Sequence, residues 1–256
     1  MKTGAAALLM LLVAAPCARA GETPLALYLA GQYARAEAAG LAQNDAEGFA
    51  IAARAVLADD MMREQPCMDC LVHAEELSRR AIASDPKRPE GHIYLAAALG
   101  YRARIIGDIA AQSQGLASKA KRELDAALVD DPRDPWALAA IGSWHIEIVR
   151  SAGPTLARWL FGARFAEGRD DYARALAIAP ENLVLHYQYA LVLAAYDFPT
   201  YRGDVENELA RAVACSPGSS YEVFARKRAS ELLDTLKRGD TAEAQRLVHR
   251  DQGYPA

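Results

Sequence analysis

The feature that most constrains the fold of this chain is a proline that recurs, at four places, five residues after an alanine. The pairs are Ala81/Pro86, Ala127/Pro132, Ala175/Pro180 and Ala212/Pro217. Before each proline the apolar residues follow a helical period, and another helical pattern starts after it. Because proline interrupts a helix, the recurrence predicts an all-α fold. The composition agrees, since alanine is abundant and only 7% of the residues are aromatic.

These strings resemble the end of the tetratricopeptide (TPR) repeat, in which a helix closes with the same alanine–proline spacing. The resemblance implies helix pairs that touch at small side chains, ten residues after each proline and seven residues before each alanine. Six of the seven testable positions hold alanine or glycine: Ala96, Gly142, Ala190, Ala74, Ala120 and Gly168, with Val205 as the exception. We therefore expect an α-solenoid of TPR-like helix pairs.

The repeats are longer than the family pattern. Successive prolines lie 46, 48 and 37 residues apart, whereas a TPR unit has about 34 residues. Most additional residues fall within 104–118 and 151–165, which are compatible with helix, so we expect enlarged repeats with longer helices. Elsewhere we expect a short unit at 24–43, a helix pair at 46–62 and 68–84, and a closing helix at 221–238. The repeat domain spans 21–240, and 241–256 should form a short helix and a frayed tail.

The stretch from Gly91 to Asp197 is also similar to the TPR-like domain of the regulator of microtubule dynamics family. The shared features are Gly142 with Trp144 and Glu147, the pair Phe161-Gly162, and a long helix over 91–104. This similarity implies helix pairs at the enlarged spacing. We do not extend it to the partner, because association with microtubules is incompatible with an exported protein.

The first twenty residues have the layout of a secretory signal peptide. Lys2 precedes an apolar run that is too short to span a bilayer, and the small-residue site Ala18-Arg19-Ala20 follows. We expect cleavage after Ala20 and a periplasmic or secreted protein that is not integral to a membrane. A lipoprotein anchored through Cys17 is the alternative, although the preceding proline is unfavourable for lipidation.

The charge of the chain excludes some partners. It has 29 basic and 33 acidic residues, and removal of residues 1–20 changes the net charge from −4 to −6. A mildly acidic chain without a basic block is not expected to bind nucleic acid. No run of Lys and Arg would hold it on anionic lipid. We therefore expect a protein or peptide partner.

Cys67-Met68-Asp69-Cys70 is the one motif with redox or metal potential. In an exported protein, two cysteines at the start of a helix favour a structural disulfide, although the loop that it closes is too short to stabilise the fold much. Unpaired thiols, a redox pair and a metal site are the alternatives. Cys215 and His73 are the candidate additional zinc ligands, at no recognisable spacing. We expect no metal and no cofactor.

The histidines form no metal-binding pattern. His92 and His186 each lie six residues after a proline and His145 follows Gly142 by three, which favours packing roles for their rings. Glu147 and Arg150 have the spacing of an ion pair on a helix. The sequence places no nucleophile–base set and no phosphate-binding loop, so we assign no catalytic residue and expect no enzyme.

The TPR resemblance implies a concave groove lined by first-helix residues one and five positions after each small residue, and by their neighbours. We expect a partner to contact Tyr101, Arg104, Ser143, Glu147, Arg150 and Tyr187. The sequence thus favours an exported scaffold or adaptor that binds a protein or peptide. The alternative is a protein that holds a small apolar ligand between the long helices, in a pocket lined by Trp144, Trp159 and Phe161.

Overall fold

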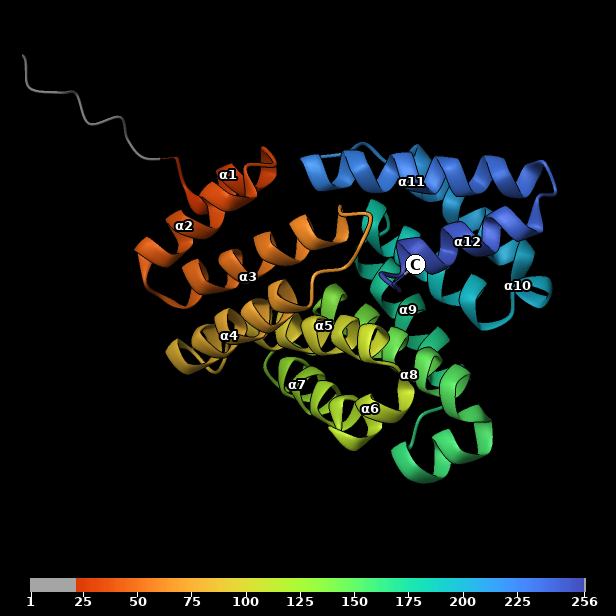
Figure 1. Ribbon diagram of the computed structural model, residues 1–256, viewed down its shortest axis with the longest axis horizontal. Coiled ribbons are helices and arrows are strands. Elements are labelled where there is room, and N and C mark those ends of the chain that lie inside the picture. Colours follow the sequence, from red (N-terminus) through yellow and green to blue (C-terminus); the bar gives the residue numbers. More distant parts are fainter. Residues whose placement is uncertain (1–21, 256) are drawn as a thin grey trace, which may run out of the picture.

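The computed structural model describes residues 22–255; the expected signal peptide, Cys17 included, lies outside the described residues. Within 22–255 the chain is all-helical, and no β-strand occurs in this range (Figure 1). The helices are α1 (Pro24–Leu29), α2 (Tyr33–Gln43), α3 (Ala46–Met61), α4 (Met68–Ser84), α5 (Pro89–Ile106), α6 (Asp108–Ser113), α7 (Leu116–Asp130), α8 (Pro135–Leu156), the π-helix η1 (Ala157–Phe161), α9 (Phe165–Ile178), α10 (Leu183–Ala214), α11 (Ser220–Lys237) and α12 (Thr241–Asp251).

The proline punctuation predicts the helix ends correctly. Each recurring proline follows a helix within three residues, after α4, α7, α9 and α10. The next helix often starts with a side-chain cap: the carboxylate of Asp134 accepts from the Ala137 N–H at 2.7 Å, and the amide oxygen of Asn182 accepts from the Leu185 N–H at 3.1 Å. Such caps satisfy amide groups that the first turn leaves without a partner. The helices expected at 46–62, 68–84 and 221–238 are confirmed by α3, α4 and α11.

The prediction that the additional residues simply lengthen the helices is wrong. α5 stops at Gly107, whose φ is +79°, and α6 is a separate short helix that ends before Gly115, with φ +62°. α8 is kinked at Gly153, where φ is +75°, directly before Pro154. A continuous right-handed helix does not contain these backbone angles, which glycine adopts without steric cost. The segments 104–118 and 151–165 therefore contain short extra helical pieces between the longer helices.

Close helix contacts occur at glycine pairs. A Cβ on Gly142 of α8 would lie 2.8 Å from the carbonyl oxygen of Gly168 on α9, and a Cβ on Gly168 would lie 2.7 Å from that of Gly142. Gly40 of α2 and Gly48 of α3 approach each other in the same way. No larger side chain fits between backbones at this separation. The small residues at 142 and 168 thus permit the packing of α8 on α9.

The two ends of the helix array meet. α1 and α11 lie side by side at the top of Figure 1, and the two helices are in contact. Gly31, just after α1, faces Ser220 so closely that a Cβ would lie 2.7 Å from the Cβ of that serine. Tyr221 of α11 packs against a buried cluster that includes Leu27 and Tyr28. This contact encloses the space between the inner helices.

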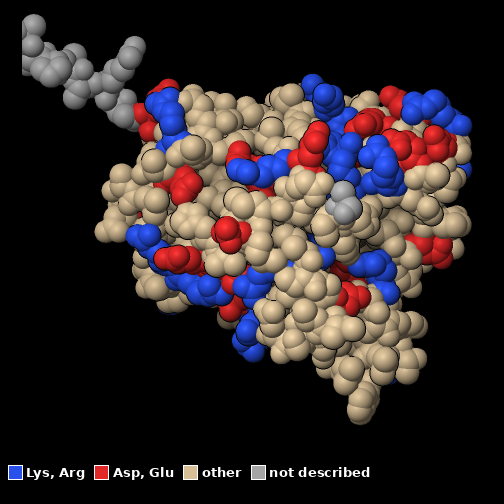
Figure 2. Space-filling model, viewed as in Figure 1, with Lys and Arg blue, Asp and Glu red and all other residues tan. Residues whose placement is uncertain are grey.

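The outer surface differs between the two ends of the view in Figure 2. Basic and acidic side chains are interspersed over α11 and α12, whereas the lower right end, formed by the residues that follow α8, shows hardly any charge (Figures 1 and 2). The largest buried cluster joins α8, α9, α10, α11 and α12. Residues 241–251 are therefore part of the same core as the preceding helices.

Candidate functional site

A cavity of about 580 Å³ lies between α5, α8 and α10 and extends from α1 and α11 to α6 and η1. Small side chains on the facing helices create much of this space, namely Ala97 and Gly100 of α5 and Ala140 and Ser143 of α8. At Gly100 a Cβ would meet no atom within 4 Å. Elsewhere in the fold, small residues allow two helix backbones to pack closely. At these four positions they leave open space instead, because no larger side chain from another helix fills it.

Aromatic residues form much of the remaining wall. Tyr94 and Tyr101 of α5 and Tyr221 of α11 line the cavity, and burial raises the pKa of the Tyr94 phenol to about 12. Trp144 and Phe161 line it as predicted. Trp159 does not: its side chain is 80% exposed, so the prediction that it lines a pocket is wrong. The turn of η1 directs this side chain away from the helices.

Arg54 supplies a positive charge to the part of the lining that also contains Tyr28, Tyr94 and Glu222; burial lowers the pKa of its guanidinium, but these neighbours together raise it overall. Its guanidinium lies 4.3 Å from the centre of the Tyr28 ring. It takes part in none of the ion pairs within residues 22–255, although Glu222 also lines this part of the cavity. Arginine stays charged at all ordinary pH values. A charged group without an ion pair at the wall of a cavity favours an anionic group beside it.

A cluster of charged groups lies on another part of the wall. The Glu147 carboxylate accepts hydrogen bonds from Arg104 at 3.1 Å and from Arg150 at 3.1 Å, and thereby connects α5 to α8. Burial lowers the pKa of the Arg104 guanidinium, but Glu147, Tyr101 and Tyr254 together outweigh this effect and the pKa is raised overall. The amide of Gln252 donates to the same carboxylate at 3.1 Å. Both arginines therefore remain charged and fixed in position.

The C-terminal segment, residues 251–254, occupies the space beside this cluster, and the expectation of a frayed tail is wrong. The backbone carbonyl of Gln252 accepts from Arg104 at 2.8 Å, and the Tyr254 hydroxyl accepts from Arg150. Asp251 is buried; it accepts from the Tyr187 hydroxyl at 2.6 Å and pairs with Arg228 and Arg250. Hydrogen bonds and burial hold this segment against the inner face, and its end lies near the middle of Figure 1.

The six predicted groove residues are brought to one region of the fold, and five of them line one cavity. Tyr101, Arg104, Ser143, Glu147 and Arg150 line the central cavity. Tyr187 is buried beneath the C-terminal segment, and burial together with the nearby Asp251 carboxylate raises the pKa of its phenol. Residues 251–254, Arg54 and Tyr221 belong to the site and were missed. Their contacts join distant parts of the chain, and no local pattern in the sequence indicates them.

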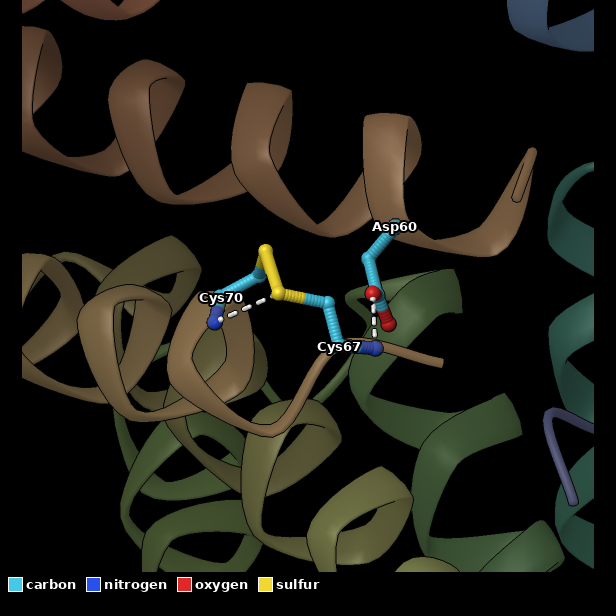
Figure 3. A group of neighbouring side chains, drawn as sticks. All are labelled: Asp60, Cys67 and Cys70. Atoms are coloured by element: carbon cyan, nitrogen blue, oxygen red, sulfur yellow. Dashed lines mark hydrogen bonds between the residues drawn. A yellow bond between two sulfur atoms is a disulfide. The ribbon is translucent and has the colours of Figure 1, made fainter. Parts of the chain in front are cut away.

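Cys67 and Cys70 form a disulfide at the start of α4 (Figure 3). The Cys67 sulfur also accepts from the Cys70 N–H at 3.2 Å, and the Asp60 carboxylate accepts from the Cys67 N–H at 2.7 Å. The three side chains lie together, but sulfur atoms that share a disulfide bond are not thiolate ligands for a metal. Burial raises the pKa of Asp60, although the Cys67 N–H acts against it. The cluster staples the loop between α3 and α4.

Two of the histidines repeat one structural contact. The Nε2 of His92 lies 3.1 Å from the carbonyl oxygen of Pro86, and its Nδ1 lies 2.7 Å from Glu123. His186 makes the same pair of contacts with Pro180 and Glu208, at 2.8 and 2.6 Å. Each ring thus ties the turn before its helix to a helical segment that follows later in the chain, α7 for His92 and the second half of α10 for His186. His145 is buried and accepts from a backbone amide, so all three rings have packing partners.

Comparison with known proteins adds no assignment: no protein-family model and no curated protein matches the sequence. Among the described residues, every helix is either too short or too polar to cross a bilayer. The function is therefore argued from the geometry alone.

Proposed function

We propose that this protein binds a small, predominantly apolar ligand in its central cavity. The observation that carries the proposal is the cavity of about 580 Å³ with a largely apolar and aromatic lining. Volumes of several hundred cubic ångströms with a few polar groups are typical of ligand sites. A ligand that fills such a space removes apolar surface from water, which contributes a favourable free energy of about 25 cal/mol for each square ångström covered.

The polar groups of the lining suggest the class of ligand. Arg54 has no ion pair within residues 22–255 and faces the cavity, whereas Arg104 and Arg150 are neutralised by Glu147. An amphiphile with one carboxylate on an apolar body would place its charge beside Arg54 and its apolar part along α5 and α8. A charge-assisted hydrogen bond to arginine would favour it over a neutral analogue of the same shape.

The experiment compares binding of a fluorescent long-chain carboxylate and of the corresponding alcohol. Gly100→Leu should abolish binding of both, because the new side chain projects into the cavity from a position where a Cβ meets no atom within 4 Å. Gly203→Leu is the matched control, since Gly203 is also helical with open space at its Cβ but lies on the exposed side of α10. Arg54→Gln should weaken binding of the carboxylate alone. Equal binding by both leucine variants would contradict the proposal.

We also propose that the helices are TPR-like units of an enlarged α-solenoid that is exported to the periplasm. The four alanine–proline helix ends and the backbone contact of Gly142 with Gly168 support the repeat assignment. The layout of residues 1–20 supports export. The proposed role is binding, with no catalytic step.

A second candidate function is that of an adaptor for a peptide. One observation favours it: the predicted groove residues already contact another segment of chain, residues 251–254, which form the end of α12 and the turn after it. A chain that ends at Arg250 should then bind a synthetic peptide of residues 251–256 added separately, and the peptide should raise its Tm. Replacement of Asp251 by alanine in the peptide should abolish the effect, because its carboxylate has three partners. A Tm that the intact peptide leaves unchanged would contradict this role.

A further inference from the structure

An exposed apolar surface lies at the end of the cavity formed by α6 and η1. It consists of Ile109, Leu156, Trp159 and Leu160, which we call the apolar tip. Ile109 is 90% exposed and Trp159 is 80% exposed, and about half of each leucine is exposed. Single exposed apolar residues are ordinary on protein surfaces, but several together indicate an interaction site.

The backbone conformation between Gly153 and Gly162 fixes the position of this exposed segment. Gly153 and Gly162 adopt positive φ at the two ends of the segment, and the Ala163 N–H donates to the Ala157 carbonyl at 3.1 Å. Ala157 and Ala163 are fully buried, in a cluster that also contains Leu116 at the start of α7. The segment is therefore anchored at its base, while Trp159 points away from the core. The Ser151 hydroxyl donates to Asp108 at 3.5 Å and joins this segment to α6.

The two segments that carry the apolar tip are richer in basic residues than the rest of this acidic chain. Residues 108–122 and 151–164 contain five basic residues and one acidic residue, Asp108, whereas the whole chain has a net charge of −4. Lys119, Arg122 and Arg158 are exposed and take part in none of the ion pairs found in residues 22–255. Because the two segments are separated along the chain, the sequence shows no basic run.

We propose that the apolar tip docks on the surface of an anionic lipid bilayer. Tryptophan with leucine at a projecting turn suits the boundary between headgroups and acyl chains. The three unpaired cations would lie over anionic headgroups. Leu160 and the adjacent Phe161 also line the cavity, so docking would place one end of the cavity against lipid. This surface goes beyond the binding role proposed above and can be tested without a cavity ligand.

The test is co-flotation of the protein with vesicles of phosphatidylcholine, with and without about 30% phosphatidylglycerol. The protein should float with the anionic vesicles and bind the neutral ones several-fold more weakly. Trp159→Ser/Leu160→Ser should reduce binding at least about tenfold, as expected from the loss of two large apolar groups. The matched control is Val129→Ser/Val223→Ser, which removes exposed apolar side chains elsewhere and should leave binding unchanged.

A second pair of variants separates charge from apolar insertion. Lys119→Gln/Arg122→Gln/Arg158→Gln should reduce binding to anionic vesicles by about fivefold per charge removed, whereas Lys227→Gln/Lys237→Gln on α11 should have little effect. These side chains are exposed, so unchanged thermal unfolding is expected for all variants. Gly100→Leu should retain vesicle binding, which separates this surface from the cavity. Failure of the unaltered protein to float with anionic vesicles, or full binding by the Trp159/Leu160 variant, would overturn the proposal.

Discussion

Glu147→Gln should destabilise the protein more than an ordinary change of a surface carboxylate. The side chain keeps its size and one acceptor oxygen, so the packing of α8 is unchanged. Its negative charge is lost, however, and Arg104 and Arg150 lose the one carboxylate that they share. Gln252 also loses a charged acceptor. Two cations then remain close together without compensation.

The magnitude follows from the exposure of the three groups. Removal of one partner from a fully buried ion pair costs about 3–5 kcal/mol. The Glu147 and Arg104 side chains are each 17% exposed and that of Arg150 is 29% exposed, so solvent still reaches them and we expect about 2–3 kcal/mol. For a chain of this size, that corresponds to a Tm lower by about 5–10 °C.

Urea unfolding followed by circular dichroism measures the loss, with Asp59→Asn as the control. Asp59 makes a single pair with Arg63 in which both side chains are about half exposed, and its replacement should change stability by less than about 0.5 kcal/mol. Glu147→Gln and Gln252→Ala should be less than additive, by about 1 kcal/mol, because they remove the same contact. Full additivity, or a loss no greater than that of Asp59→Asn, would refute the docking of the C-terminal segment on this cluster.

Three further changes probe packing, titration and the disulfide. Gly142→Val should lower the unfolding free energy by about 3 kcal/mol because its side chain would meet the facing backbone, whereas Gly100→Ala should be neutral or stabilising; similar losses would contradict the packing. Burial lowers the pKa of His186, but its hydrogen bonds to Glu208 and to the Pro180 carbonyl, with the charge of Glu208, together outweigh this and raise the pKa overall. The stabilisation that His186 provides is then complete below the pKa of the unfolded state, about 6.5, and is lost as the pH rises through the pKa of the folded state. His186→Gln should therefore lower the free energy of unfolding more at about pH 5.5 than at about pH 8.5, as measured by urea titration. An equal loss at both pH values would contradict this. Replacement of Cys67 and Cys70 by serine should cost at most about 2 kcal/mol, since the loop is short. The alanine pair should cost about 1 kcal/mol more, because it removes the acceptor that caps α4; equal Tm values would refute the cap.

Helix ends are predictable from this sequence because their causes are local. A proline after a helix, or an asparagine or aspartate before one, acts on the backbone within a few residues. The breaks inside the enlarged repeats are not predictable in the same way. Gly100 and Gly142 are helical, whereas Gly107 and Gly153 have positive φ. Glycine permits both conformations, and only the tertiary packing of the inserted segments selects between them.

The candidate site was predictable only as far as the repeat frame extends. That frame places Tyr101, Ser143 and Glu147 on the inner side of their helices, and all three line the cavity. It cannot show what faces them, since Glu147 and Gln252 are 105 residues apart in the chain. The prediction for Trp159 is wrong for a related reason. Its apolar character predicts burial, but the backbone turn at η1 directs the side chain outward.

The contacts of the C-terminal segment favour one of the two proposed binding roles. A partner peptide that took the place of residues 251–254 would have to break the contacts of Asp251 with Tyr187, Arg228 and Arg250, and would leave a buried carboxylate or buried arginines without partners. Such losses cost several kcal/mol before any new contact forms. A small apolar ligand breaks none of these bonds, because the space between α5 and α8 is already present. The closure of α1 on α11 therefore favours capture of a small ligand over docking of an extended peptide.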